Sequence, residues 1–203
     1  MAKLALDILK NTIPQSNCKI KEVWMDADGC LVDWEGYVAK RLHLFSDIFH
    51  IKDFRANIPI LNSMDKVERE VLIKKYYRRF PDTFLNLDIT TECFHLIEIM
   101  KYLDSKDIPV KILTSLDNKH HDLDTAKTHK LLNLTGHLNQ FGVNYDIEVV
   151  TTHSDKTQYA KHGGLLIDDY HRNVSTFIDK GGMGICHKDP NKTIMELVDL
   201  LKA

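Results

Sequence analysis

The sequence predicts an α/β fold in which a parallel sheet is flanked by helices, with a small all-helical insertion after the first strand. Three observations predict it. From about residue 88 onward, short apolar segments of strand type alternate with longer helical segments, which is typical of parallel sheets with right-handed crossovers. One further strand-like segment, Val23–Met25, lies well before this region. Between the two, residues 33–87 lack strand-like runs and are rich in aromatic and basic side chains.

The first elements are a lead-in helix and the first strand. Residues from Lys3 to about Cys18 carry five apolar side chains, with Pro14 as a stop, and predict a short helix or a lead-in segment that packs beside the sheet. Val23–Met25 follows as a strand and ends in Asp26-Ala27-Asp28-Gly29, where the glycine permits a sharp turn of the backbone.

The insertion is expected to be helical throughout. Trp34–Phe45 has a helical pattern, and Lys66–Arg79 carries Val67, Val71 and Leu72 at helical spacing before Pro81 ends it. We therefore divide the chain into a core of residues 1–32 and 88–203 and an insertion of residues 33–87.

The remaining elements alternate in type. A helix capped by Thr90 or Thr91 is expected to run to about Ser105, with Phe94, Ile97, Met100 and Tyr102 or Leu103 on its buried side. The strands expected after it are Val110–Leu113, Ile147–Val150, Leu165–Ile167 and Met183–Cys186. The helices expected between and after them are Asp124–Leu138, Lys156–His162, Asn173–Lys180 and Thr193–Lys202.

Composition excludes several classes of function. The apolar share of 43% and the charged share of 28% are ordinary for a globular protein, and a net charge of −2 supplies no general attraction for nucleic acid. Charge interrupts the N-terminus too early for a secretory signal, and no apolar run is long enough to span a bilayer. Four scattered cysteines predict reduced thiols in a cytoplasmic protein, and the eleven histidines form no zinc motif. The sequence leaves the oligomeric state open, with a homodimer among the options.

Polar residues that follow the strands suggest a site at one edge of the sheet. Ligands of open α/β sheets lie beyond the carboxyl ends of the strands. Asp26 and Asp28 are expected to point the same way there, because side chains alternate along an extended chain. Two like charges so close are costly unless a cation joins them or one is protonated. An acidic turn with only a structural role remains the alternative when this segment is considered alone.

Three further segments make that alternative less attractive. They are Lys111-Ile112-Leu113-Thr114-Ser115, then Lys156, then Leu165-Leu166-Ile167-Asp168-Asp169. Together with Asp26-Ala27-Asp28-Gly29-Cys30-Leu31, they resemble in type and order the four motifs of the haloacid dehalogenase (HAD) superfamily of phosphatases. This resemblance implies a Rossmann-like HAD core, and it identifies the insertion with the small helical cap that one branch of the superfamily carries after the first strand.

The resemblance also implies a role for each motif residue. Asp26 is the expected nucleophile, Asp28 the general acid–base, Thr114 or Ser115 the hydrogen-bond donor to the phosphoryl oxygens, and Lys156 the balancing cation. Lys127, Lys130 and Lys161 are competitors in less favourable positions. Mg²⁺ is the expected cofactor, with oxygen ligands from Asp26, the backbone carbonyl of Asp28 and the Asp168-Asp169 pair. The family pattern favours Asp169 as the direct ligand, and the order within the pair stays open.

Within the superfamily, the motifs most resemble those of the 5′(3′)-deoxyribonucleotidases, including Phe84-Leu85-Asn86-Leu87 and Asp155-Lys156-Thr157. The segment after Asp169, Tyr170-His171-Arg172-Asn173, departs from that family. The expected substrate is a nucleoside monophosphate, with Phe45, Phe49 and Phe84 as candidates to contact the base. Neither a membrane nor a nucleic acid is expected as a partner.

Two other functions remain open. The first is a phosphatase of nucleic-acid 3′ ends or of another small metabolite, for which the basic residues Lys74, Lys75, Arg78 and Arg79 could hold a phosphate backbone. The second is a HAD-like binding module without catalysis. Such a module would be free to lose Asp26, Asp28 or Lys156, and all three are present.

Overall fold

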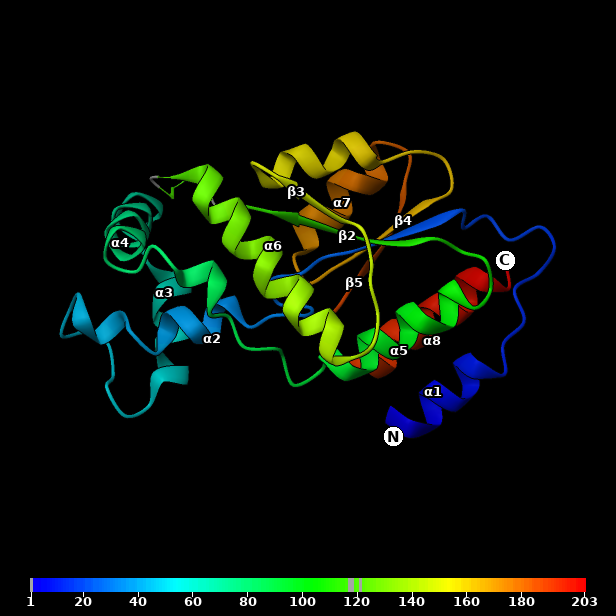
Figure 1. The fold of residues 1–203 in the computed structure, drawn as a ribbon, viewed down its shortest axis with the longest axis horizontal. Coiled ribbons are helices and arrows are strands. Elements are labelled where there is room, and N and C mark those ends of the chain that lie inside the picture. The colour runs from blue at the N-terminus through cyan, green and yellow to red at the C-terminus, as the bar shows by residue number, and fades with distance from the viewer. Residues whose placement is uncertain (1, 117–118, 121) are drawn as a thin grey trace.

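The computed structural model describes residues 2–116, 119–120 and 122–203 (Figure 1). Its centre is a five-stranded sheet in which every pair of neighbours is parallel, in the order β3-β2-β1-β4-β5. The strands are β1 (Glu22–Met25), β2 (Val110–Ser115), β3 (Ile147–Val150), β4 (Gly164–Asp168) and β5 (Met183–Cys186). The carboxyl end of β1 therefore lies between the ends of β2 and β4.

Helices cover both faces of the sheet. They are α1 (Ala2–Lys10), α5 (Cys93–Asp104), α6 (Leu123–Gln140), α7 (His171–Asp179), α8 (Pro190–Leu201) and the 3₁₀ helix η4 (His153–Tyr159). Alternation along β1 divides the core between the two faces. Val23 and Met25 join the large apolar cluster that includes residues of α1, α5, α6 and α8, whereas Trp24 packs with Phe177 of α7 on the opposite face.

The insertion forms a separate group of helices at one end of the molecule (Figure 1). It contains α2 (Trp34–Ala39), η1 (Leu42–Leu44), η2 (Phe54–Ala56), α3 (Asn57–Ser63), α4 (Lys66–Arg79) and η3 (Thr83–Leu85). The predicted fold class is thus confirmed: a parallel sheet flanked by helices, with an all-helical insertion after the first strand.

The chain leaves the core and returns to it through two adjacent segments. Val32 and Ile89 form an isolated antiparallel bridge, and the Asp33 N–H donates to the Asp88 carbonyl at 2.8 Å. These bonds lie at the edges of the insertion predicted for residues 33–87, and the division into two domains stays a prediction.

Hydrogen bonds from two side chains of α6 hold the last part of the insertion in place. Nδ2 of Asn133 donates to the carbonyl oxygens of Leu85 (3.1 Å) and Leu87 (3.0 Å). Nε2 of His137 is hydrogen-bonded to the same Leu87 oxygen at 2.9 Å. Because these side chains bind backbone atoms, they fix the path of η3 over the core whatever side chains η3 carries.

Several expected elements differ from the structure. The helix expected over Lys156–His162 is η4, which begins at His153, since the Asp155 carboxylate accepts from the Thr152 N–H (2.8 Å) and starts the helix earlier. The helix expected to end at Phe45 stops at Ala39, and a 3₁₀ turn follows. In α5, Phe94 is 54% exposed and not buried, because the buried face runs through Leu96, Ile97, Met100 and Leu103.

The same helix begins later than expected. Thr90 does not cap it, because its hydroxyl donates instead to the Cys30 carbonyl at 2.6 Å, beside the point where the insertion leaves the core. Cys93 is the first helical residue, and Glu92 precedes it without a capping hydrogen bond from its side chain.

None of the helices in the described part of the chain combines the length and apolar character that a membrane crossing requires.

Candidate active site

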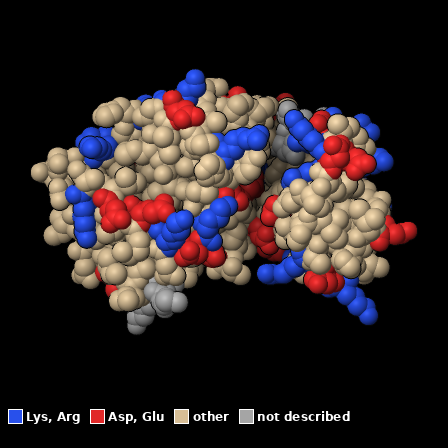
Figure 2. All heavy atoms as spheres, turned by 180° about the vertical axis from the view of Figure 1, so that it is seen from behind, with Lys and Arg blue, Asp and Glu red and all other residues tan. Residues whose placement is uncertain are grey.

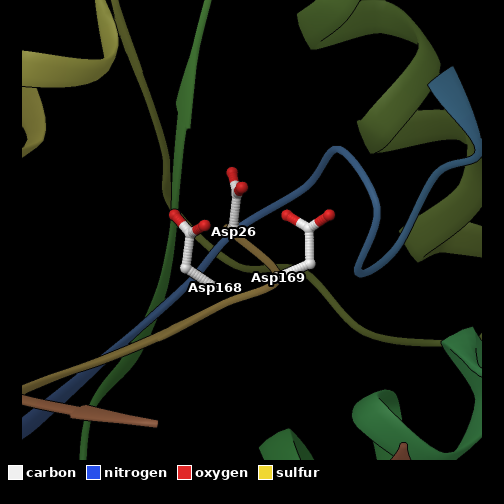
Figure 3. Close-up of side chains that lie close together, drawn as sticks. All are labelled: Asp26, Asp168 and Asp169. Atoms are coloured by element: carbon white, nitrogen blue, oxygen red, sulfur yellow. The ribbon is translucent and has the colours of Figure 1, made fainter. Parts of the chain in front are cut away.

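Three carboxylates meet at the carboxyl edge of the sheet (Figure 3). Asp26 follows β1, Asp168 is the last residue of β4, and Asp169 comes next. One oxygen from each lies within 4.8 Å of the others. The parallel register explains the meeting: Met25 pairs with Ile167, and the Asp26 N–H donates to the Ile167 carbonyl at 2.9 Å, so both strands end at the same level.

Lys156 lies against two of these carboxylates. Its Nζ is 2.7 Å from Oδ1 of Asp26 and 2.7 Å from Oδ2 of Asp168, and all three side chains are buried. Burial alone would lower the pKa of Lys156, but the Asp26 and Asp168 carboxylates outweigh it and raise that pKa above its ordinary value. Lys156 is therefore a permanent cation at neutral pH. It contacts the carboxyl ends of β1 and β4, which are far apart in the sequence.

Asp168 and Asp169 have different surroundings. Both oxygens of Asp168 are engaged: Oδ1 accepts from the Tyr170 N–H (2.8 Å), Oδ2 accepts from Lys156, and Nδ2 of Asn173 lies within 3.2 Å of each. For the Asp169 carboxylate, no hydrogen bond to any described residue is present, although Lys188 lies near enough to act on it electrostatically. Asp168 thus orients the lysine, and Asp169 keeps its oxygens available.

The cluster carries more negative charge than the lysine balances. Burial and then the neighbouring Asp168 raise the pKa of Asp26 well above its usual range, and the same two causes raise the pKa of Asp169 to about 7. A divalent cation with hard oxygen ligands would remove this repulsion, so the residues present fit Mg²⁺. The neighbouring Cys30 is no alternative nucleophile, because burial raises the pKa of its thiol well above the ordinary value.

Gly29 allows the turn to pass close to this cluster. Its φ of 76° lies in the left-handed region, and a Cβ at this position would stand 2.1 Å from Oδ2 of Asp169. Both the backbone angle and the space therefore require glycine, and the turn brings the segment from Asp26 to Gly29 against Asp169.

The Asp28 carboxylate pairs with Lys130, which the sequence offers only as a less favourable candidate for the catalytic cation. Its Oδ2 accepts a hydrogen bond from Nζ of Lys130 at 2.5 Å, whereas Asp26 contacts Lys156. The two aspartates of the turn thus have separate cationic partners. Lys130 lies on α6, 102 positions along the chain from Asp28, and the apolar residues around it in the sequence gave no sign of its burial.

The two hydroxyl residues at the end of β2 also differ. Oγ1 of Thr114 is buried and has no hydrogen-bond partner among the described residues. Oγ of Ser115 is hydrogen-bonded to Nδ1 of His153 at 2.8 Å. Thr114 therefore has a donor to offer to a ligand, and His153 is a further residue at this edge that the sequence analysis missed.

The three phenylalanines proposed to contact a base lie in or beside the core of the insertion. Phe45 is partly buried and packs on Tyr76 and Phe80, with ring centroids 5.8 and 6.2 Å away. Phe49 and Phe84 are 4% and 1% exposed. Phe84 is connected to the site, because Nζ of Lys130 lies 4.9 Å from its ring centroid. The role of all three in substrate binding stays a prediction.

The surface between the core and the insertion is charged. Seen from behind, a narrow furrow separates the larger lobe from the smaller one, and acidic side chains gather along it (Figure 2). A hollow of about 460 Å³ is lined by Tyr37, Lys40, Arg41, Asp82, Asn86 and Asp88. Its charges of opposite sign are equal in number, and its lining is confined to the insertion and Asp88, so it is not the site at the strand ends.

Comparison with known proteins supports the fold. No family model and no curated protein matches the sequence. Among solved structures, a hydrolase from Streptococcus pneumoniae TIGR4 is similar over 90% of this chain and 98% of its own, with a TM-score of 0.52 and 15% identity. L-2-haloacid dehalogenase from Xanthobacter autotrophicus is similar over 81% of this chain and 76% of its own, with a TM-score of 0.49 and 10% identity. At such identities the likeness concerns the fold alone, and the chain shares its α/β fold with the hydrolase from Streptococcus pneumoniae TIGR4.

The raised pKa of Asp169 predicts how stability depends on pH. The folded state holds this proton more tightly than the unfolded state, so the stabilising contribution is present below about pH 4 and lost as pH rises through about 7. In chelator, Asp169→Asn should therefore be more stable than wild type at pH 8, by about 2 kcal/mol after allowance for partial exposure, and nearly equal at pH 4. Urea unfolding at the two pH values measures this.

Asp179→Asn is the matched control, because Asp179 is exposed at the end of α7 and should show no such trend. Added Mg²⁺ should reverse the order at pH 8 by stabilising wild type more than Asp169→Asn. Identical pH dependence of wild type and Asp169→Asn would contradict the electrostatic interpretation of the cluster.

Proposed function

We propose that the protein is a Mg²⁺-dependent phosphatase that hydrolyses nucleoside monophosphates through an aspartyl-phosphate at Asp26. The observation that carries the proposal is the arrangement around this carboxylate. The Asp26 carboxylate, directly after β1, lies 2.7 Å from Nζ of Lys156 and in one cluster with the Asp169 carboxylate, whose oxygens have no hydrogen bond to the described residues. Thr114, whose hydroxyl has no partner among those residues either, belongs to β2, the neighbour of β1. Nucleophile, cation and hydrogen-bond donor thus converge at one edge of the sheet.

In the first step, an Asp26 oxygen attacks phosphorus. The ester P–O bond breaks with its electron pair going to the leaving oxygen, which takes a proton from Asp28. Thr114 donates to a phosphoryl oxygen, and Lys156 balances the charge that develops. Mg²⁺, when held by Asp26, Asp169 and the Asp28 carbonyl, would offset repulsion between the nucleophile and a dianionic phosphate.

In the second step, water attacks the phosphorus of the aspartyl-phosphate. Its proton goes to Asp28, which the first step left ionised, and the bond between phosphorus and the Asp26 oxygen breaks to restore the carboxylate. The sum is a phosphate monoester plus water giving an alcohol plus phosphate. Asp28 ends as it began, so one carboxyl serves both half-reactions.

The insertion supports a small substrate. It lies beside the strand ends, and η3 is held to α6 by backbone-directed hydrogen bonds. A lid of this kind would exclude water, and any aromatic ring of it that reaches the substrate would stack on a base at about 1–3 kcal/mol. Phe84 is the candidate with the nearest link to the catalytic residues, through Lys130.

The test is one comparison of kcat/KM, with Mg²⁺, on a deoxynucleoside monophosphate, a sugar phosphate and a 3′-phosphorylated oligonucleotide. We expect the mononucleotide to be hydrolysed best and activity to vanish when Mg²⁺ is removed. If the oligonucleotide is preferred, the interpretation of the insertion as a lid over a small substrate is wrong. The basic face of α4 is then the next candidate for binding the substrate. The side chains of that face, Lys74, Lys75, Arg78 and Arg79, are exposed as on an ordinary solvated helix.

A further inference from the structure

The buried charge of Lys130 has no role in the mechanism given above. Lys130 lies on α6 and is 1% exposed, whereas Lys127, one turn earlier on the same helix, is exposed. A lysine is almost never fully buried unless its charge is paired. Something in its surroundings must therefore compensate for the loss of hydration.

The ammonium group of Lys130 meets three segments of the chain. It donates to Oδ2 of Asp28 at 2.5 Å and to the carbonyl oxygen of Ser115 at 2.7 Å, and the ring centroid of Phe84 lies 4.9 Å away. These partners belong to the turn after β1, the end of β2 and the insertion. An ammonium has three N–H donors, and two of them are used by Asp28 and Ser115. The ring on a third side leaves Lys130 poorly placed to bind a phosphate directly.

The Asp28 carboxylate is held by one oxygen only. Oδ1 of Asp28 is buried and has no hydrogen-bond partner among the described residues, while Oδ2 is bound to Lys130. The lysine thus fixes the orientation of the carboxyl group and leaves Oδ1 available. The remaining oxygen is the one that can exchange a proton with a ligand.

We propose that Lys130 is a positioning residue for Asp28, which it holds so that Oδ1 faces the leaving oxygen of the substrate. This inference rests on the proposed phosphatase function. Because the same ammonium touches Ser115 and Phe84, the orientation of Asp28 depends on the docking of η3 and on the end of β2. Each aspartate thus has its own lysine: Asp26 pairs with Lys156, and Asp28 pairs with Lys130.

The test uses the dependence of the rate on the leaving group. An alkoxide leaves poorly without a proton, whereas nitrophenolate leaves readily without one, so a defect in proton transfer lowers the rate on the first far more. For Lys130→Met, we expect kcat/KM to fall by about 10²-fold on a deoxynucleoside 5′-monophosphate and by less than about tenfold on p-nitrophenyl phosphate. Lys127→Met is the matched control and should be unchanged on both substrates.

A second comparison distinguishes the proposed role of Lys130 from a defect in folding. Asp28→Asn should show the same leaving-group pattern, and the double variant Asp28→Asn/Lys130→Met should lose nothing more on the alkyl substrate. Should Lys130→Met fail to fold, the double variant carries the test, because it removes both charges of the pair. A double variant less active than Asp28→Asn would overturn the proposal.

An equal loss on both substrates for Lys130→Met would also overturn it, because a purely structural defect does not distinguish leaving groups. Wild-type activity on the two monoesters separates this failure from that of the proposed function. If wild type hydrolyses neither, the phosphatase assignment fails, and the role of Lys130 fails with it.

Discussion

Asp26→Asn should abolish phosphatase turnover, by roughly 10⁴-fold or more, the order of loss seen when a catalytic nucleophile is removed. An amide of the same shape cannot attack phosphorus to give an aspartyl-phosphate. The substitution keeps the hydrogen-bonding geometry of a side chain that is buried between Lys156 and the other acids. The rate of nucleotide hydrolysis with saturating Mg²⁺ is the measurement.

The same variant should fold as well as wild type. Burial and like charges raise the pKa of Asp26, so replacing the carboxyl by a neutral group removes a repulsion at neutral pH. Asp179→Asn is the control for the chemistry of the substitution. Residual activity must be checked by mass spectrometry for deamidation back to Asp. Appreciable turnover by the intact amide would rule out the covalent mechanism.

The sequence predicts where the strands end and which residues follow them, because this pattern involves only neighbouring residues. A short apolar run followed by Asp26 or by Thr114 specifies both a buried strand and what stands at its tip, and the parallel sheet then brings the tips together. The five strands were predictable for this reason, and the insertion was predictable because residues 33–87 lack strand-like runs. Helix ends were less so, since a single carboxylate such as Asp155 moved the start of η4 by three residues.

The partners that lie across the fold could not be predicted. Nothing near Lys130 in the sequence shows that its charge is buried against Asp28, because the pairing depends on where α6 crosses the sheet edge. Likewise, Val67 and Val71 mark α4 as helical but are exposed, and Leu72, Ile73, Tyr76 and Tyr77 form its buried face. Spacing identified that helix without identifying the side on which the core lies.

Lys156→Met should cost both activity and stability. It leaves the buried carboxylates of Asp26 and Asp168 without the cation that lies 2.7 Å from each, and an uncompensated buried charge costs about 3–5 kcal/mol. Activity should fall by about 10³-fold, because the charge that develops on the phosphoryl group is no longer balanced. Urea unfolding in chelator and kcat/KM on a mononucleotide are the two measurements.

The loss of stability should depend on pH in a stated direction. Because the folded-state pKa of Lys156 is raised, its stabilising contribution is complete at neutral pH and lost only as pH rises beyond its ordinary value of about 10.4. In Lys156→Met, protonation of Asp26, whose pKa burial and the Asp168 carboxylate raise, removes the repulsion, so the deficit relative to wild type should shrink from pH 8 to pH 5. Lys161→Met is the control, because Lys161 is exposed and its pairing with Glu22 at 3.1 Å should contribute no more than about 1 kcal/mol.

A double variant separates the two effects of Lys156. Lys156→Met/Asp168→Asn removes one negative charge together with the positive one, so most of the lost stability should return, while activity should stay low because the site still lacks its cation. If the double variant is as unstable as Lys156→Met, the deficit comes from packing around the long side chain and not from charge. If activity returns along with stability, Lys156 acts only by holding the fold, and the cation that balances the phosphoryl group must be sought elsewhere at the sheet edge.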